Sequence, residues 1–160
     1  MIRKIERNEL PVCADVVRRS FMTVADEFGF TPENAPRFVA FCTTTERLAY
    51  QLDEQHRLMF AYLEDGEILG FYSLLMGEVG ECELGSLSVL PEYRHNGIGT
   101  ELLAHAMDTA RSIGCSVLRL SIVEENQVLR RWYESKGAVH TGTEKFDFFP
   151  FTCGYMRIEL

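Results

Sequence analysis

A short glycine-containing segment constrains this chain more than any other feature of its sequence. Leu87, Val89 and Leu90 are strand formers, and Pro91 ends that strand because proline has no N–H to give to a ladder. The segment 94–99, Arg-His-Asn-Gly-Ile-Gly, follows, and apolar residues then recur at helical spacing up to Gly114. The sequence therefore predicts a strand, a glycine loop and a helix over 97–113.

A glycine loop at the start of a helix favours an anionic ligand. The first N–H groups of a helix are unpaired and the helix dipole attracts negative charge, above all a phosphate. Two nucleotide-binding loops are excluded by the residues themselves. A Walker loop needs Gly-Lys-Ser/Thr, which the chain lacks. A dinucleotide fingerprint needs a small residue three positions after Gly99, and that position holds Leu102.

The pattern Arg94-x-x-Gly97-x-Gly99, directly behind Leu-Ser-Val-Leu-Pro-Glu-Tyr, closely resembles the acyl-CoA signature of the GNAT superfamily of N-acetyltransferases. The resemblance implies that the loop amides hold the CoA pyrophosphate and that the preceding strand pairs with the pantetheine arm. An ordinary strand-to-helix loop, with glycines for geometry only, is the alternative. The residues that the resemblance assigns to acetyl-CoA are Leu87, Ser88, Val89, Arg94, His95, Asn96, Gly97, Ile98, Gly99, Thr100, Asn126 and Tyr133.

A second segment also resembles a GNAT signature. Asn126 is followed seven residues later by Tyr133, which begins a Tyr-Glu-x-x-Gly sequence. Seven residues make about two helical turns, so both side chains are expected on one face. The resemblance implies that Asn126 hydrogen-bonds the cofactor arm and that Tyr133 lies beside the departing thiolate. A thiol has a pKa of about 8.5 and a phenol one of about 10, so a phenol can share its proton with the thiolate. The alternatives are a helix N-cap for Asn126 and packing against the sheet for Tyr133.

The general base is less determined by the sequence. Attack on a thioester requires a neutral amine, and an alkyl amine is mostly protonated near neutrality. A carboxylate on the central strand can remove that proton directly or through water. Glu83 matches the position where many GNAT members have a glutamate, and Glu81 is its neighbour on the same strand face. The family has no universal base, so Glu83, Glu81 and water all stay open, with Glu83 preferred.

The remaining periodicity predicts an α/β fold (α+β by some schemes). A glycine at position 85 interrupts a strand pattern and predicts a β-bulge. The GNAT resemblance implies a three-layer fold with a central mixed sheet of six to seven strands, helices on both faces, and the order β-α-α-β-β-β-α-β-α-β-β. In that family the bulge opens a slot for the thioester. The other expected elements are a strand 2–7, a helix capped by Asn8, a broken helical region 32–52, strands 57–63, 67–76, 81–89 and 116–123, a helix 124–137, and strands 139–146 and 152–160.

Composition limits the class of protein. The length suits one domain over residues 1–160. A net charge of −8 argues against a nucleic-acid partner, which would need a basic face. Five cysteines, odd in number and without a CxxC pair, predict reduced thiols in the cytoplasm, and the four histidines lack the spacing of metal ligands. No window has the length of a membrane span or the pattern of a signal peptide.

The resemblance implies an acetyl-CoA-dependent N-acetyltransferase that needs no metal and transfers the acetyl group to a primary amine by direct attack. The expected catalytic residues are Tyr133 and Glu83, with strand amides polarising the carbonyl. The alternative is a non-catalytic acyl-CoA-binding or sensing module on the same scaffold, against which the presence of Tyr133 argues. The acceptor, a small molecule or a peptide, cannot be read from the sequence, although the aromatic 146–151 segment hints at an apolar body. A homodimer stays open.

Overall fold

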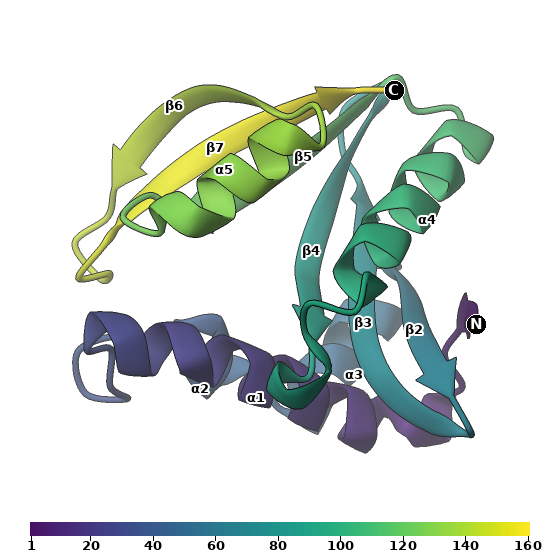
Figure 1. The fold of residues 1–160 in the computed structure, drawn as a ribbon, viewed down its shortest axis with the longest axis horizontal. Coiled ribbons are helices and arrows are strands. Elements are labelled where there is room, and N and C mark those ends of the chain that lie inside the picture. Colours follow the sequence, from purple (N-terminus) through teal and green to yellow (C-terminus); the bar gives the residue numbers. More distant parts are fainter.

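The computed structural model describes residues 1–160 and is built around one seven-stranded sheet in the order β1-β2-β3-β4-β5-β7-β6 (Figure 1). All neighbouring strands are antiparallel except β4 and β5, which are parallel. The predicted mixed sheet is therefore confirmed. The strands are β1 Ile2–Lys4, β2 Leu58–Glu64, β3 Glu67–Met76, β4 Glu81–Val89, β5 Val117–Val123, β6 Val139–Lys145 and β7 Thr152–Glu159.

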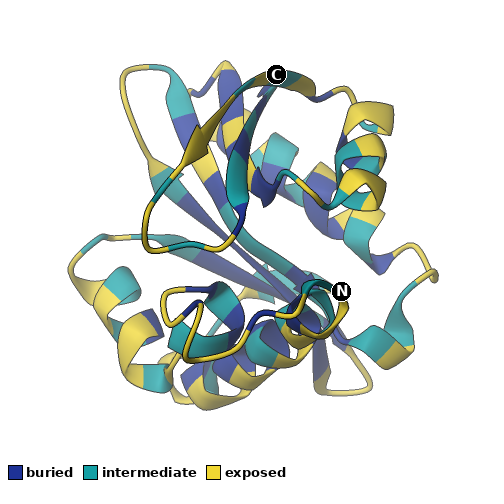
Figure 2. Ribbon diagram, turned by 90° about the vertical axis from the view of Figure 1, so that its left-hand side faces the viewer, coloured by how far each residue is buried: buried dark blue, intermediate teal, exposed yellow.

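Helices cover both faces of this sheet, as the expected three-layer arrangement requires. Both α1 and α4 contact β3 and β4, and they do so from opposite faces (Figure 1). Buried residues concentrate in the strands between them (Figure 2). None of the helices combines the length and the apolar character that a bilayer crossing needs. The helices are α1 Leu10–Phe28, α2 Val39–Cys42, α3 Thr45–Asp53, α4 Ile98–Ser112 and α5 Gln127–Ser135.

Two predictions for the N-terminal third are wrong in detail. Asn8 does not cap α1, because residues 7–9 form a 3-10 turn that is closed by a capping box between Glu6 and Glu9. The broken helix does not begin at position 32 either. The side chains of Thr31 and Asn34 each accept a hydrogen bond from the other's backbone N–H, which stabilises a turn instead of a helix. The helical region consequently starts at α2.

The predicted bulge is present in β4. The register between β3 and β4 passes from Phe71 opposite Ser88 to Ser73 opposite Gly85, so two steps on β3 match three on β4. Within the bulge, Ser86 has a φ of 52°, in the left-handed region. An extra residue of this kind bends a strand and interrupts its pairing.

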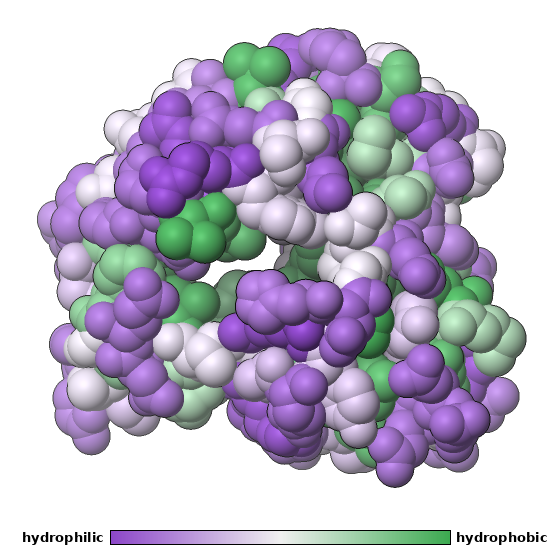
Figure 3. Space-filling model, viewed as in Figure 1, coloured by the Kyte–Doolittle hydropathy of each residue, from purple (hydrophilic) through white to green (hydrophobic).

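Just before the bulge, β4 separates from β5. Their parallel pairing ends at Glu83 opposite Arg119, although β4 continues to Val89 and β5 to Val123. Figure 1 shows the two strands diverging from that point, and Figure 3 shows an opening between the layer of α5, β6 and β7 and the part that contains α1. The fold thus contains a slot between two strands of its central sheet.

Contacts on each side of the slot hold its walls. The helix α4 lies so close against β3 that a Cβ added to Gly70 would be 2.7 Å from Leu102 Cδ1. The buried Tyr72 hydroxyl is hydrogen-bonded to His105 Nδ1 at 2.7 Å in the same interface. At the open end, an aromatic cluster bridges the two halves, with the rings of Phe30 and Phe151 4.9 Å apart.

Candidate active site

The loop between β4 and α4 presents six consecutive N–H groups, residues 95–100, that make no hydrogen bond within the chain. Two residues of the loop are left-handed, His95 with a φ of 65° and Gly97 with a φ of 83°. Alternation of left-handed with other conformations turns successive N–H groups toward one point and makes an anion-binding concavity. The N-terminus of α4 adds its dipole at the same place. This arrangement suits a phosphate or diphosphate group.

The two signature glycines have different roles in this loop. The backbone conformation of Gly97 favours glycine, since a positive φ strains most other residues. Gly99 lies in the first turn of α4, where an added Cβ would be 3.6 Å from the Trp132 ring, an ordinary contact. The fold therefore does not require glycine at position 99, and its effect is to leave the helix N-terminus uncovered.

The side chain of Arg94 is used by the fold. Its guanidinium donates hydrogen bonds to Thr23 Oγ1 at 3.0 Å, to the Ser20 carbonyl at 2.8 Å and to Ser20 Oγ at 3.1 Å. These contacts attach the loop to α1. The Asn96 side chain is also turned inward, since its Nδ2 donates to the carbonyls of Tyr93 and Arg94. Both side chains therefore shape the loop, and the loop offers a ligand its backbone.

The strand before the loop supplies a polar edge. Residues 84–89 of β4 have no partner strand on the side of β5, because the pairing of these two strands ends at Glu83. The predicted residues Leu87, Ser88 and Val89 lie in this stretch, with Ser88 buried and its hydroxyl bonded to the Ser86 carbonyl at 2.7 Å. An extended ligand can hydrogen-bond to such an edge as an additional strand does.

The second predicted segment lies at the start and the middle of α5. Asn126 is the N-cap of the helix, where its Oδ1 accepts a hydrogen bond from the Leu129 N–H at 3.2 Å, as the alternative interpretation expected. Its Nδ2 makes no hydrogen bond in the chain and stays available. Trp132, beside Tyr133, lies against the loop at Gly99, so α5 and the glycine loop border the same opening.

Tyr133 combines burial with a free hydroxyl. Its side chain is 6% exposed and packs in the main core cluster. The hydroxyl makes no hydrogen bond in the chain, and it is not among the buried polar atoms that lack a partner, so it keeps some contact with solvent. Burial raises the pKa of Tyr133. The phenol therefore stays protonated over the whole physiological pH range and can donate a proton or a hydrogen bond.

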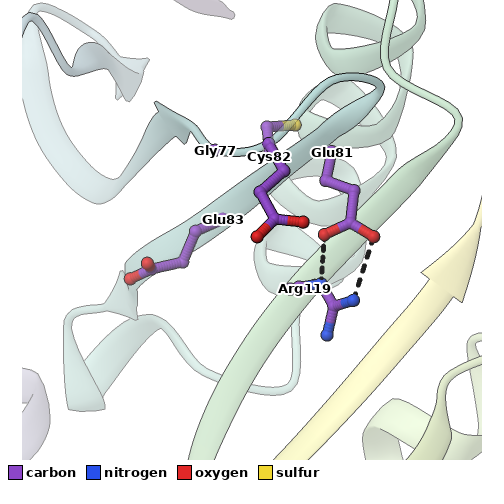
Figure 4. A pocket seen from close by; sticks show the side chains of 6 residues that line it. Gly77, Glu81, Cys82, Glu83 and Arg119 are labelled. Atoms are coloured by element: carbon purple, nitrogen blue, oxygen red, sulfur yellow. Dashed lines mark hydrogen bonds and ion pairs between the residues drawn. The ribbon is translucent and has the colours of Figure 1, made fainter.

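Glu81 and Glu83 lie where β4 and β5 begin to separate, and their carboxylates have different partners (Figure 4). The carboxylate of Glu81 accepts two hydrogen bonds from Arg119, at 2.5 and 2.9 Å, and these bonds lower its pKa. The carboxylate of Glu83 points away from that pair, with 53% of its side chain exposed. Its nearest cation is Arg57, with Nη2 3.6 Å from Oε1. Of the two carboxylates, Glu83 is the more available proton acceptor. Both line an open hollow of about 390 Å³ with Gly77, Glu78, Cys82 and Arg119.

Two charged residues near the slot were not identified from the sequence. Glu124 follows β5 and accepts hydrogen bonds from Arg130 of α5 and His140 of β6, each at 2.8 Å, which fixes α5 to the sheet. Arg57 precedes β2 and extends to β4, where its guanidinium occupies the space beside Gly85. In the sequence, the glycine in the middle of this strand indicated that some group packs closely against the backbone at position 85. It did not identify that group as the Arg57 side chain.

Comparison with known proteins places this geometry in a family. The model of the Acetyltransferase (GNAT) family matches residues 24–138. An uncharacterised N-acetyltransferase of Mycobacterium bovis is 30% identical over 115 residues, 72% of this chain and 74% of that protein. The thialysine N-epsilon-acetyltransferase of Bos taurus is 31% identical over 134 residues, 83% of this chain and 72% of that protein.

A solved structure shares the fold over the full length. The PaiA N-acetyltransferase from Thermoplasma acidophilum, in complex with coenzyme A, superposes with a TM-score of 0.84 at 22% identity, covering 100% of this chain and 98% of that one. The ribosomal-protein-S18-alanine N-acetyltransferase from Escherichia coli superposes with a TM-score of 0.78 at 20% identity, covering 99% and 92%.

The contacts of Arg94 lead to a prediction on stability. Replacing Arg94 by Ala should lower the free energy of unfolding by about 1–3 kcal/mol, because it removes hydrogen bonds of a charged donor to α1. Thr23→Val, which removes one acceptor, should cost about 1 kcal/mol. Urea unfolding of the three proteins measures both values. A variant as stable as the native chain but with sharply reduced affinity for acetyl-CoA would instead place the guanidinium on the phosphates.

Proposed function

The chain belongs to the Acetyltransferase (GNAT) family, and we propose that it transfers the acetyl group of acetyl-CoA to a primary amine by direct nucleophilic attack. The family makes it an enzyme of acetyl transfer. The observation that carries the specific proposal is the row of six unpaired N–H groups at residues 95–100 beside the slot between β4 and β5. One end of this site fits a diphosphate and the other a linear amide-bearing arm, which are the two parts of CoA that precede the thioester.

In this proposal the chain binds acetyl-CoA along a continuous path. The N–H groups of residues 95–100 hold the diphosphate, Arg94 keeps their loop against α1, and the free edge of Leu87, Ser88 and Val89 pairs with the pantetheine arm. Nδ2 of Asn126 donates a hydrogen bond to the same arm. Bound acetyl-CoA supplies a thioester carbonyl, the electrophile of the reaction.

Three groups of the chain then act on the reaction. Glu83 takes a proton from the acceptor ammonium, directly or through water, which frees the nitrogen lone pair for attack on the carbonyl carbon. Backbone N–H groups of β4 stabilise the negative charge that develops on the carbonyl oxygen. Tyr133 donates a proton to the thiolate when the C–S bond breaks, and it is reprotonated, through solvent, by the proton that the positively charged nitrogen of the intermediate gives up. Its raised pKa supports this role, because the donor must be protonated before the step.

The proposal extends to the acceptor, the location and the assembly of the chain. The names of the bovine and bacterial relatives refer to acetylation of amino groups, which supports a small molecule or a peptide as acceptor. Five free cysteines support a cytoplasmic location. We also propose one domain over residues 1–160, a reaction that needs no metal, and a chain that acts as a monomer or a homodimer.

The role of Tyr133 can be tested with a panel of primary amines. We expect acetyl-CoA-dependent release of free CoA thiol with at least one amine, and Tyr133→Phe should lower kcat by about 10- to 1000-fold with little change in acetyl-CoA affinity. The difference should persist up to about pH 10, because the phenol does not ionise below that. Tyr50→Phe, at an exposed position, is the control. Equal turnover of the native chain and the Tyr133→Phe variant rejects the role.

The identity of the base can be tested by comparing two neighbours. Glu83→Gln should lower kcat/KM by about 100-fold at pH 7, and the loss should shrink at pH 9.5, where more of the amine is already neutral. Glu81→Gln should have a smaller effect, because Arg119 already occupies that carboxylate. Steady-state pH profiles of both variants decide between them. If neither variant changes the acid limb of the profile, water is the base.

A further inference from the structure

Arg57 precedes β2, but its positive charge lies beside β4, near the point where β4 and β5 separate. Its Nη1 reaches Ser73 on β3, and the same atom lies 2.8 Å from the place where a Cβ on Gly85 would be. Gly85 is the second residue after Glu83, where β4 begins to leave β5. Only 12% of the Arg57 side chain is exposed. The guanidinium therefore lies against β4, next to the proposed base.

The hydrogen-bonding capacity of this guanidinium is largely unused. Of its five N–H donors, Nε bonds to Gln55 Oε1 at 3.1 Å and Nη1 to Ser73 Oγ at 3.5 Å, the long limit of a hydrogen bond. Nη2 makes no hydrogen bond, and its nearest carboxylate oxygen, on Glu83, is 3.6 Å away. Nη2 is not among the buried atoms that lack a partner, so it keeps contact with solvent.

Arg119, on the same face of the sheet, is a useful comparison, because its guanidinium has a close carboxylate partner. It donates two hydrogen bonds, at 2.5 and 2.9 Å, to both oxygens of Glu81. Arg57 has no such fork with Glu83, so an ion pair with Glu83 does not account for its position. A mostly buried guanidinium whose only carboxylate neighbour is 3.6 Å away is poorly satisfied, and a carboxylate that entered the slot would give it charge-assisted, bidentate bonds.

Resting on the function proposed above, we propose that Arg57 binds the carboxylate of the acceptor, and that the acceptor is a free amino acid. Glu83 and Arg57 then receive the two opposite charges of one zwitterion, the ammonium at Oε1 and the carboxylate at Nη2, two atoms only 3.6 Å apart. In an α-amino acid a single carbon separates amine and carboxylate, which matches so close a pair of charges. A peptide N-terminus would offer a neutral carbonyl instead, a weaker partner for a guanidinium.

The experiment compares matched acceptors that differ only at the carboxylate. Leucine, phenylalanine and lysine are each assayed as the free acid, the carboxamide and the decarboxylated amine, with saturating acetyl-CoA and detection of free thiol. For the native chain we expect kcat/KM of the acids to exceed that of the carboxamides and amines by at least about tenfold. The amine pKa of a carboxamide is lower than that of the free acid, so a larger fraction of the carboxamide is present as neutral amine. This favours reaction of the carboxamides, so it cannot produce the expected preference for the acids.

Two variants separate recognition of the carboxylate from general electrostatics. Arg57→Gln should raise the KM for the acids about tenfold and bring the acid-to-carboxamide ratio close to one. Arg57→Lys keeps the charge without the planar fork and should give an intermediate ratio. Arg119→Gln removes a neighbouring positive charge that already has a partner and should retain the native ratio. Circular dichroism and acetyl-CoA affinity confirm that each variant is folded.

A binding measurement that needs no turnover supplements the assay. In the presence of CoA, N-acetyl-leucine should raise the melting temperature of the native chain, N-acetyl-leucinamide should do so less, and Arg57→Gln should remove this difference. The proposal is overturned if acids and carboxamides react alike, or if Arg57→Gln lowers kcat for all acceptors equally, as a residue that only positions Glu83 would. A failure of the proposed function looks different, because then no amine at all gives acetyl-CoA-dependent thiol release.

Discussion

The separation of β4 from β5 is the constraint on which the rest of the site depends. Backbone N–H and C=O groups away from water must be paired, and a strand inside a sheet normally meets this need with its neighbours. Here the pairing ends at Glu83 opposite Arg119, in the middle of the sheet. The bulge at Ser86 is the local cause, since an extra residue bends β4. The polar edge of residues 84–89 is left without a partner strand on the side of β5, and we propose that a ligand pairs with it.

The glycine loop continues this edge with a row of unpaired N–H groups that suits an anion. The left-handed residues His95 and Gly97 and the start of α4 leave six N–H groups without partners in the chain. Such a loop is useful only if its position is fixed, because a misplacement of about 1 Å is costly in an enzyme. Arg94 attaches it to α1, and Glu124 attaches the facing helix α5 to the sheet. The fold uses charged side chains to position backbone groups.

The sequence predicted what depends on local rules. Pro91, the glycines of the loop and the helical period after them predict the strand, loop and helix that are found, and Gly85 predicts the bulge. The cap at Asn8 was wrong because the chain already turns at Arg7–Glu9, where Glu6 and Glu9 form a capping box one turn before α1, and propensity alone does not fix that start. Arg57 was missed because its place over Gly85 depends on the pairing of three strands, which a single sequence does not reveal.

Amide chemical shifts can show whether the backbone between β4 and α4 holds the diphosphate of acetyl-CoA, as we propose. On titration of the isotope-labelled chain with acetyl-CoA, we expect the largest shifts at residues 95–100 and a second group at 87–89. Acetylpantetheine, which lacks the diphosphate, should shift the second group and leave the first in place. Binding of acetyl-CoA with no shift at residues 95–100 would show that this loop does not hold the diphosphate.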